Sequence, residues 1–219
     1  MAATKGYRGM GMEGGIARWY AKLTRKSLPE FKALAQHMAA NLSPGARVLE
    51  VAPGPGYFAI ALAKLGKFEI TGLDISKTFV EIARRNAKEQ NATVDFRQGN
   101  ASRMPFPDAS FDLIVCRAAF KNFSEPVRAL AEMRRVLSPG GKAVIIDLRR
   151  DTPREELNRY IDAMNVSAVS ALLMKWTFRL MLLKRAYTRD EFERMIAESA
   201  WEIFQINETP VGFEITLAK

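Results

Sequence analysis

The sequence predicts a doubly wound α/β fold, and three observations carry this prediction. Short apolar runs alternate with helical segments between residues 46 and 150, which is typical of parallel βαβ units. The runs are nearly continuous in Val, Ile, Leu and Phe, as in strands buried on both faces. The chain also has 219 residues and 48% hydrophobic content, enough for one domain with a full core.

Two helices are expected before the first strand. Residues 1–15 are rich in glycine, so we expect them to be loose or ordered only by a ligand. A helix is predicted over residues 16–24. Ser27 and Glu30 form a capping-box pattern with Pro29 in the first turn, which predicts a second helix that ends near Asn41.

The central part of the chain alternates strands and helices. Ser76 and Ser124 each precede a helical pattern and are predicted as N-caps, and a Pro-Gly-Gly sequence is expected to end the helix that follows Ser124. The expected strands are residues 46–51, 68–75, 93–99, 111–117 and 142–148, and the expected helices are 57–66, 76–91 and 124–141.

The pattern changes after Asp151. Thr152 and Glu155 form a second capping-box pattern, with Pro153 at the first helical position, and we expect a long Met-rich helix there. Thr188 with Glu191 predicts one more helix. Residues 202–207 and 213–218 are expected to form an antiparallel strand pair that closes one edge of the sheet.

Charge and cysteine content limit the partners and the compartment. The net charge is +9 with a pI near 9.8, which raises nucleic acid or an anionic membrane as a partner. The single cysteine, Cys116, allows no intramolecular disulfide, and no secretory signal is visible, so we expect a cytoplasmic protein. Residues 163–183 are apolar but interrupted by Lys175 and Arg179, which favours a buried or interfacial helix over a membrane span.

A glycine-rich turn follows the first expected strand. Gly54-x-Gly56-x-x-Ala59 matches the dinucleotide-binding pattern, which nicotinamide, flavin and S-adenosylmethionine binders share. Asp74 ends the second strand, where a carboxylate can accept from ribose hydroxyls. Glu50 lies inside the first strand just before this turn, where a carboxylate can hold the loop amides or lie near a cationic ligand. A pyrophosphate site gains nothing from a carboxylate there. The prolines stiffen a loop that a ligand approaches closely.

Five motifs in order carry a family resemblance. The chain has E-V-A-P-G-P-G, L-D-I-S, G-N-A, M-P-F-P-D-A-S-F-D and R-V-L-S-P-G-G-K. Over residues 40–150 it resembles the class I S-adenosylmethionine-dependent methyltransferases. Within that class it is most similar to the small-molecule group that includes the ubiquinone/menaquinone C-methyltransferases.

The resemblance implies a Rossmann-like seven-stranded sheet whose last strand is antiparallel. It also implies S-adenosylmethionine as cofactor, S-adenosylhomocysteine as product, and no metal. Asp74 would hold the ribose diol, Ile75 would pack on the adenine, and Asn100, where the family more often has Asp, would meet the adenine edge. The residues it places at the cofactor are Glu50, Ala52, Pro53, Gly54, Gly56, Asp74, Ile75, Asn100, Ala101 and Arg117.

The methyl acceptor would lie beyond the fourth strand, at residues 116–123. This stretch has no N-P-P-Y or D-P-P-Y sequence and no Pro-Cys nucleophile, which disfavours amino-directed or C5 methylation of nucleic-acid bases. The only histidine, His37, lies near the N-terminus and is expected on a helix surface. Lys121 is a candidate to orient an anionic acceptor oxygen, with a solvated loop lysine as the alternative. Tyr20 is a candidate to close over the cofactor, with simple packing as the alternative.

One domain in three parts is predicted. Residues 1–45 form a helical lid, 46–150 the cofactor-binding core, and 151–219 a lid helix, a further helix and the terminal strands. Met10, Met12 and the Met-rich helix would cover a small apolar or aromatic acceptor. The excess of apolar residues on that helix also fits a homodimer face or a peripheral contact with anionic lipid.

Two other functions stay open. An RNA methyltransferase would explain the positive charge, although no appended RNA-binding module is visible. A cofactor-binding protein without catalysis, acting as a sensor or partner subunit, would explain the lack of an obvious base. Glu50 and the later motifs disfavour a nicotinamide oxidoreductase.

Overall fold

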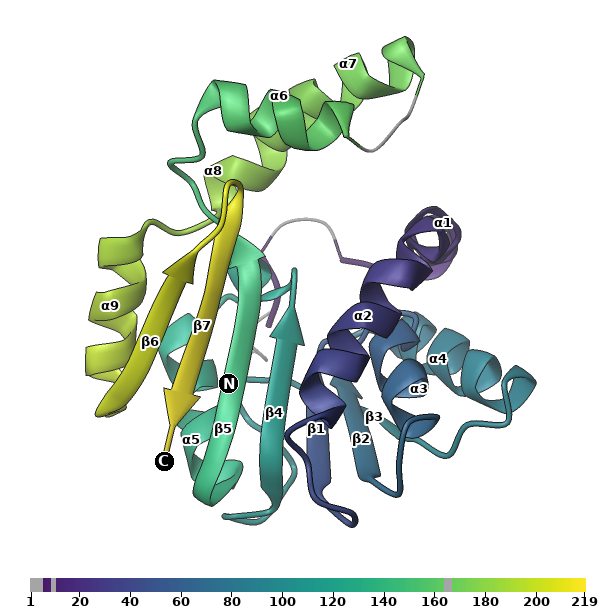
Figure 1. Ribbon diagram of the computed structural model, residues 1–219, viewed down its shortest axis with the longest axis vertical. Coiled ribbons are helices and arrows are strands. Elements are labelled where there is room, and N and C mark those ends of the chain that lie inside the picture. The colour runs from purple at the N-terminus through teal and green to yellow at the C-terminus, as the bar shows by residue number, and fades with distance from the viewer. Residues whose placement is uncertain (1–5, 9–10, 164–166) are drawn as a thin grey trace, which may run out of the picture.

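A mixed sheet forms the centre of the structure, a computed structural model that describes residues 6–8, 11–163 and 167–219. Its strands are β1 (Arg47–Val51), β2 (Glu69–Asp74), β3 (Asp95–Gln98), β4 (Phe111–Arg117), β5 (Leu137–Leu148), β6 (Ile203–Glu208) and β7 (Gly212–Ala218). The order across the sheet is β3-β2-β1-β4-β5-β7-β6. Strands β1 to β5 are parallel, and β7 runs antiparallel to both of its neighbours, as the arrows in Figure 1 show. The predicted doubly wound, seven-stranded sheet is confirmed.

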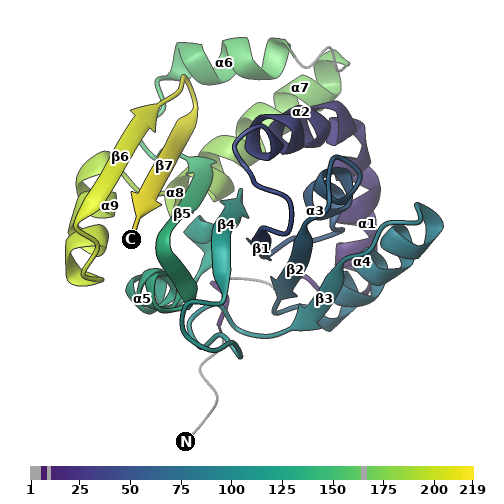
Figure 2. The same ribbon diagram turned by 60° about the horizontal axis from the view of Figure 1, so that its bottom comes forward.

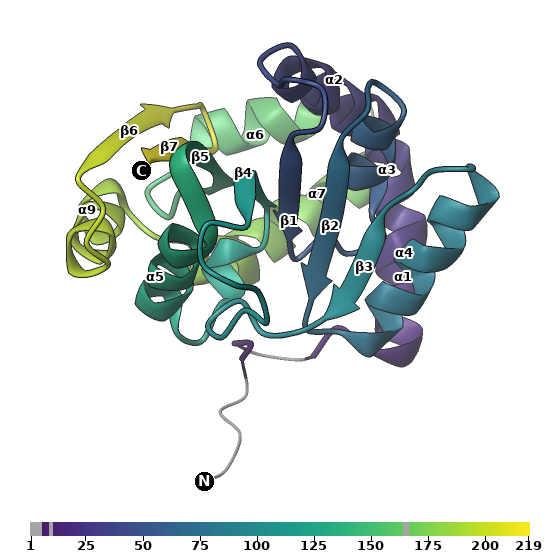
Figure 3. The ribbon, with the colours of Figure 1, turned by 90° about the horizontal axis from the view of Figure 1, so that it is seen from below.

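Helices cover both faces of this sheet (Figures 2 and 3). The helical elements are α1 (Gly14–Thr24), η1 (Arg25–Ser27), α2 (Leu28–Ala39), α3 (Tyr57–Ala63), α4 (Lys77–Glu89), η2 (Phe120–Asn122), α5 (Pro126–Val136), α6 (Arg154–Asp162), α7 (Ala168–Thr177), η3 (Phe178–Leu182), α8 (Leu183–Arg185) and α9 (Arg189–Glu198). Side chains of α2, α3 and α4 share one apolar core with the sheet, and those of α5 and α9 share the other.

Alternation along each strand assigns its side chains to the two cores. In β1, Val48 packs in the α2–α4 core and Leu49 in the α5–α9 core. In β4, Val115 packs in the α2–α4 core and Cys116 in the α5–α9 core. Successive side chains of a strand point to opposite faces, so Glu50 lies on the face of Val48, toward α3. Cys116 is fully buried, and burial raises the pKa of its thiol, so this side chain packs in the core.

Three of the five predicted helix caps are wrong. Ser27 makes no side-chain cap because the 3₁₀ turn η1 leads directly into α2, which leaves Ser27 outside the extended conformation that capping requires. Ser124 does not cap α5, which begins at Pro126. The Thr152 hydroxyl donates to the carbonyl of Arg149 at 2.7 Å instead of capping α6. The caps at Ser76 and Thr188 are confirmed, the latter with its full capping box.

Two helix boundaries also differ from the prediction. Helix α5 ends at Val136, and Leu137 already belongs to β5, so the Pro-Gly-Gly sequence lies in a strand beside an irregular register between β4 and β5. The predicted long Met-rich helix is divided into α6, α7, a π-helical segment η3, and α8. Met10 and Met164 lie outside the described residues.

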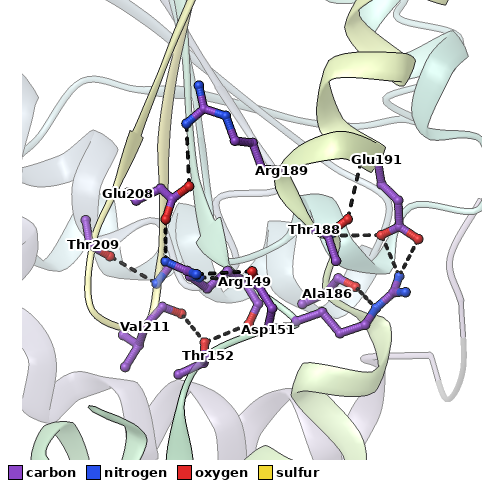
Figure 4. Close-up of polar contacts among 12 residues, drawn as sticks. Arg149, Asp151, Thr152, Ala186, Thr188, Arg189, Glu191, Glu208, Thr209 and Val211 are labelled. Carbon is purple, nitrogen blue, oxygen red and sulfur yellow. Dashed lines mark hydrogen bonds and ion pairs between the residues drawn. The ribbon is translucent and has the colours of Figure 1, made fainter.

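Helices α6 and α7 lie beyond the carboxyl ends of the parallel strands, and α1 lies near the same end of the sheet (Figure 1). Ion pairs fix the chain where it leaves β5. Arg149 contacts Asp151 at 2.9 Å and Glu208 of β6 at 2.6 Å, and Glu208 also contacts Arg189 (Figure 4). Across the described part of the chain, no helix combines the length and apolar character needed to cross a membrane.

Candidate cofactor and acceptor site

The crevice between β1 and β4 is the natural ligand position in this sheet. From β1 the strand order runs to β2 and β3 on one side, and from β4 it runs to β5 on the other. Ligands of open α/β sheets bind outside the carboxyl ends of the strands at such a switch point. The predicted glycine-rich loop lies there, between β1 and α3.

Three residues of this loop have left-handed backbone conformations. Ala52, Gly54 and Gly56 have φ values of 56°, 55° and 79°. A side chain on Gly56 would lie 2.6 Å from Phe96, so packing under the loop requires glycine there. A side chain on Gly54 would meet no atom within 4 Å. Gly54 therefore leaves open space in which a ligand can approach the backbone.

Asp74 holds this loop from the end of β2. Its carboxylate accepts from the backbone N–H of Gly54 and of Ser76, each at 2.9 Å. Burial raises the pKa of Asp74 to about 6, against the opposing effect of these backbone hydrogen bonds. The carboxylate therefore gains from a ligand that offers further donors, such as a ribose diol.

Glu50 is buried beside this loop and is 3% exposed. Its Oε2 accepts from the N–H of Ala59 in α3 at 3.1 Å. Burial raises the pKa of Glu50 to about 8, and the nearby Asp74 acts in the same direction. The sequence suggested that Glu50 could hold the loop amides, but the structure gives that role to Asp74. Glu50 is instead a buried carboxyl that a neighbouring cation would ionise.

Ile75 and Asn100 lie side by side at the edge of the crevice. Ile75 is 38% exposed although it follows a buried strand. The Asn100 side-chain oxygen accepts from the N–H of Ser102 at 2.9 Å. Ala101, which lies between these two residues in the sequence, is half-buried. Gly6 lies so close that a side chain there would be 2.6 Å from Ile75 and 2.7 Å from Asn100. The start of the chain therefore covers the predicted adenine position.

We call residues 6–8 and 11–14 the N-terminal strap. The N–H of Arg8 donates to the carbonyl of Asn122 at 2.7 Å. The Glu13 carboxylate accepts from the N–H groups of Lys77 and Thr78 at the start of α4, each at 3.0 Å. Although burial opposes it, these hydrogen bonds lower the pKa of Glu13. These hydrogen bonds hold the described strap residues against α4 and the crevice, so these residues are not loose in the structure. Their ordering by a ligand stays a prediction.

Because the strap is rich in glycine, its sequence does not predict these contacts with α4 and the crevice. Only the position of Glu13 just before a helix gave a signal in the sequence, and its partner Thr78 is 65 residues away. Contacts over such separations are not visible in local patterns.

Arg117 and Tyr20 each contact neighbouring helices. Arg117, the last residue of β4, donates to Glu30 of α2 at 2.7 Å, and its guanidinium lies 4.4 Å from the ring centre of Phe31. Tyr20 packs edge-on against Phe79, with ring centres 5.9 Å apart, and burial raises the pKa of Tyr20. The side chain of Arg117 thus ties β4 to α2, whereas its role toward a cofactor stays a prediction.

Lys121 is not a solvated loop lysine. Its residue is 4% exposed, and its ammonium donates to Asp147 at 2.7 Å and to the carbonyl of Ala118 at 2.6 Å. The same Asp147 carboxylate accepts from the backbone N–H of Lys121 at 2.9 Å. This buried ion pair joins η2 to β5. Because the ammonium is already paired, the geometry favours a positioning role for Lys121 over direct contact with an acceptor anion.

Three buried polar atoms near the strap have no hydrogen-bond partner among the described residues: Asn122 Oδ1, Ser124 Oγ and the Tyr187 hydroxyl. The strap passes next to two of these residues, since Arg8 bonds to the Asn122 carbonyl and its guanidinium lies 5.6 Å from the ring centre of Tyr187. Buried polar atoms usually have partners. The missing hydrogen bonds of these three atoms are ones that a bound polar ligand could supply.

The family match agrees with this geometry. Residues 49–145 match the family model described as a methyltransferase domain. The matched range begins in β1, contains the glycine loop and Asp74, and ends in β5. By this similarity, residues 49–145 carry a methyltransferase domain. S-adenosylmethionine is the cofactor that the similarity implies, and the open space at Gly54, the Asp74 carboxylate and the buried Glu50 carboxyl fit that cationic nucleoside.

Curated relatives match between about half and two thirds of the chain. The demethylmenaquinone methyltransferase of Deinococcus radiodurans is 43% identical over 102 residues, 46% of this chain and 42% of the relative. The ubiquinone/menaquinone biosynthesis C-methyltransferase UbiE of Cupriavidus metallidurans is 34% identical over 141 residues, 64% of this chain and 53% of the relative. The chain thus spans about half the length of the curated relatives that it matches.

Solved structures of methyltransferase folds resemble nearly the whole chain. A Methanococcus maripaludis protein assigned to the S-adenosyl-L-methionine-dependent methyltransferases superposes with a TM-score of 0.79 at 22% identity, over 97% of this chain and 95% of that one. The YcgJ protein of Bacillus subtilis gives a TM-score of 0.60 at 28% identity, over 82% and 70%. The first likeness covers nearly the whole chain and shows a shared fold.

Proposed function

We propose that this methyltransferase domain transfers a methyl group from S-adenosylmethionine to a small apolar or aromatic acceptor. The observation that carries the proposal is Asp74, a carboxylate buried at the switch point and fixed by the backbone of Gly54 and Ser76. A fixed carboxylate beside an open glycine loop suits a ribose diol.

The chain's own residues bind and orient the cofactor in this proposal. Asp74 accepts from the ribose hydroxyls, Ile75 packs against the adenine, and Asn100 bonds to the adenine edge. Glu50 lies where a positive charge would stabilise its ionised form. S-adenosylmethionine supplies a methyl group on a positively charged sulfur, from which an acceptor atom displaces it in line. The remaining task of the protein is to hold the acceptor and exclude water.

We infer an aromatic acceptor of the quinone or phenol type. The names of the relatives from Deinococcus radiodurans and Cupriavidus metallidurans refer to demethylmenaquinone and to ubiquinone/menaquinone biosynthesis. In this chain, large apolar side chains of α1 stand near the carboxyl ends of the strands (Figure 1), including Trp19, which is 64% exposed. Such side chains suit an apolar ring.

The described acceptor end offers no free histidine base. His37 is exposed on α2, and Lys121 is paired with Asp147. The proposed reaction therefore depends on positioning and on an acceptor that ionises readily, as a phenol or quinol does, with water taking the proton. Tyr20 stays a candidate for covering the cofactor.

Two alternatives remain as outcomes of the test. RNA methylation is motivated by the net charge of +9. A function without methyl transfer is motivated by the fold itself, because the [4+2]-cyclase SpnF shares it with a TM-score of 0.61 at 25% identity.

The first test is calorimetric titration of the protein with S-adenosylmethionine, S-adenosylhomocysteine and, as control, NAD. We expect micromolar binding of both adenosyl ligands and no binding of NAD. A transfer assay with labelled methyl groups then compares quinols, phenols, thiols, amines and RNA. Labelling of RNA alone, or binding without transfer to any acceptor, would each contradict the proposal. Absence of adenosyl binding would withdraw the cofactor assignment.

A further inference from the structure

Helix α7 and the π-helical segment η3 carry a row of exposed apolar side chains. Folded soluble surfaces show single exposed apolar residues, but a contiguous set marks an interaction site. The five large ones, with their exposed fractions, are Leu172 (72%), Leu173 (62%), Trp176 (59%), Leu180 (41%) and Met181 (47%).

The opposite side of the same segment is packed, so the exposed row is not a poorly folded helix. Ala171, Met174 and Phe178 contact a small core formed by α6 and α8. Residues 172, 173, 176 and 180 recur at helical spacing on the other side. The segment thus has two apolar faces and only one of them has a partner within the described chain.

Positive charge surrounds the exposed row. The sequence contains no acidic residue between Asp162 and Asp190, but it contains Lys175, Arg179, Lys184, Arg185 and Arg189. Lys175 is paired with Asp162 at 2.7 Å, whereas Lys184 is exposed.

A shallow pocket of about 400 Å³ adjoins this segment, lined by Arg150, Arg179, Leu183 and Lys184. Arg150 is held by both oxygens of Glu191, at 2.9 and 2.7 Å, and Glu191 also bonds to Thr188 (Figure 4). Arg179 contacts the Asn158 oxygen at 3.1 Å. Lys184 and Arg179 therefore remain as cations that can receive an anionic group at the edge of the apolar row.

We propose that α7 and η3 dock on an anionic lipid bilayer. The exposed row enters the interface between headgroups and acyl chains, and Arg179 with Lys184 binds lipid phosphates at the pocket. A helix of ten residues is about 15 Å long and lies along the surface. Apolar residues flanked by cations are the pattern that interfacial helices use.

Charge and side-chain type favour lipid over the other occupants. A second copy would bring the same cations against each other in a symmetric contact, which is repulsive. RNA would match the charge, but four of the five large exposed side chains are leucine or methionine, which offer bases no stacking platform, and only Trp176 could stack. An anionic bilayer matches both features.

Docking would turn the candidate site toward the lipid, because α6 and α7 lie beyond the carboxyl ends of the parallel strands (Figure 1). An apolar acceptor could then enter from the bilayer. The docking itself does not depend on methyl transfer, and its test needs no cofactor or acceptor.

The test is flotation of the full chain with vesicles of phosphatidylcholine alone or with 30% phosphatidylglycerol. We expect binding to the anionic vesicles that weakens as salt rises, with at least about tenfold weaker binding to neutral vesicles. The double substitution L172S/L173S is expected to reduce binding to anionic vesicles by about tenfold or more. Its matched control is I203S/F204S on β6, where the two residues are 64% and 42% exposed, and it should bind like the unchanged protein.

Lys184→Glu tests the contribution of positive charge at the pocket. Its control for net charge is Lys88→Glu, at an exposed position of α4. We expect about tenfold weaker anionic-vesicle binding only for the first. Equal binding to both vesicle types, or unchanged binding of L172S/L173S, would overturn the proposal. Light scattering that shows a dimer dissociated by L172S/L173S would overturn it in favour of self-association. Circular dichroism and adenosyl-ligand titration verify that each variant is folded.

Discussion

The pH dependence of stability should come largely from Glu50, and Glu50→Gln isolates it. Burial raises the pKa of Glu50 from 4.5 to about 8, so the folded protein without ligand holds a proton that the unfolded chain has lost above pH 4.5. The stabilisation is therefore complete below pH 4.5 and is lost as pH rises to about 8. Each pH unit in this window changes the free energy of unfolding by about 1.4 kcal/mol, or roughly 5 kcal/mol in total.

That total is an upper value, because Asp74 titrates in an overlapping range. Burial raises the pKa of Asp74 from 3.8 to about 6, and the two carboxyls repel when both are ionised. Between pH 5 and pH 8.5 about three pH units of this window are sampled, so we expect Glu50→Gln to remove roughly 2 to 4 kcal/mol of the decrease in unfolding free energy. Glutamine keeps an oxygen that can accept from the Ala59 N–H.

The assay is urea unfolding at pH 5 and pH 8.5 for the unchanged protein, Glu50→Gln and the control Glu69→Gln, an exposed carboxyl at the start of the neighbouring strand. The control should retain the pH dependence of the unchanged protein. The same reasoning predicts that adenosyl-ligand affinity rises with pH as Glu50 and Asp74 ionise, and that Glu50→Gln weakens both the affinity and its rise. Parallel stability curves for Glu50→Gln and the unchanged protein would refute the assignment of a buried neutral carboxyl.

Three further substitutions test other contacts. Asp74→Asn removes a charged acceptor and should weaken S-adenosylhomocysteine binding about 10- to 100-fold by calorimetry; an unchanged affinity would contradict its place at the ribose. Lys121→Met leaves Asp147 buried and unpaired and should lower the free energy of unfolding by about 3–5 kcal/mol, whereas adding Asp147→Leu should recover most of it; equal losses in both variants would argue against the pair. Glu13→Ala frees the strap from α4 and should speed adenosyl-ligand dissociation in stopped-flow measurements with little change in melting temperature, and unchanged rates would show that the strap does not cover the site.

The sequence by itself determined the sheet and the cofactor loop. Strands such as β1 and β4 have nearly continuous apolar sequences. Because successive side chains of a strand point to opposite faces, such a sequence predicts burial on both faces of the sheet. The loop residues Gly54 and Gly56, and Asp74 at the end of the second strand, occur at fixed spacings because the βαβ unit is a local structure. The cap at Thr188 was predictable for the same reason, since its partner Glu191 is three residues away.

Only the tertiary structure decided the contacts between distant segments. Whether Glu50 or Asp74 holds the Gly54 amide depends on how β1 and β2 pair, which the local sequence around each carboxylate does not show. Lys121 looks like a solvated loop lysine until the chain returns through β5 with Asp147. The strap appears loose until Gly6 packs against side chains about 70 and 94 residues away. Local patterns record the periodicity of an element, whereas burial and pairing of single polar groups depend on which elements the fold brings together.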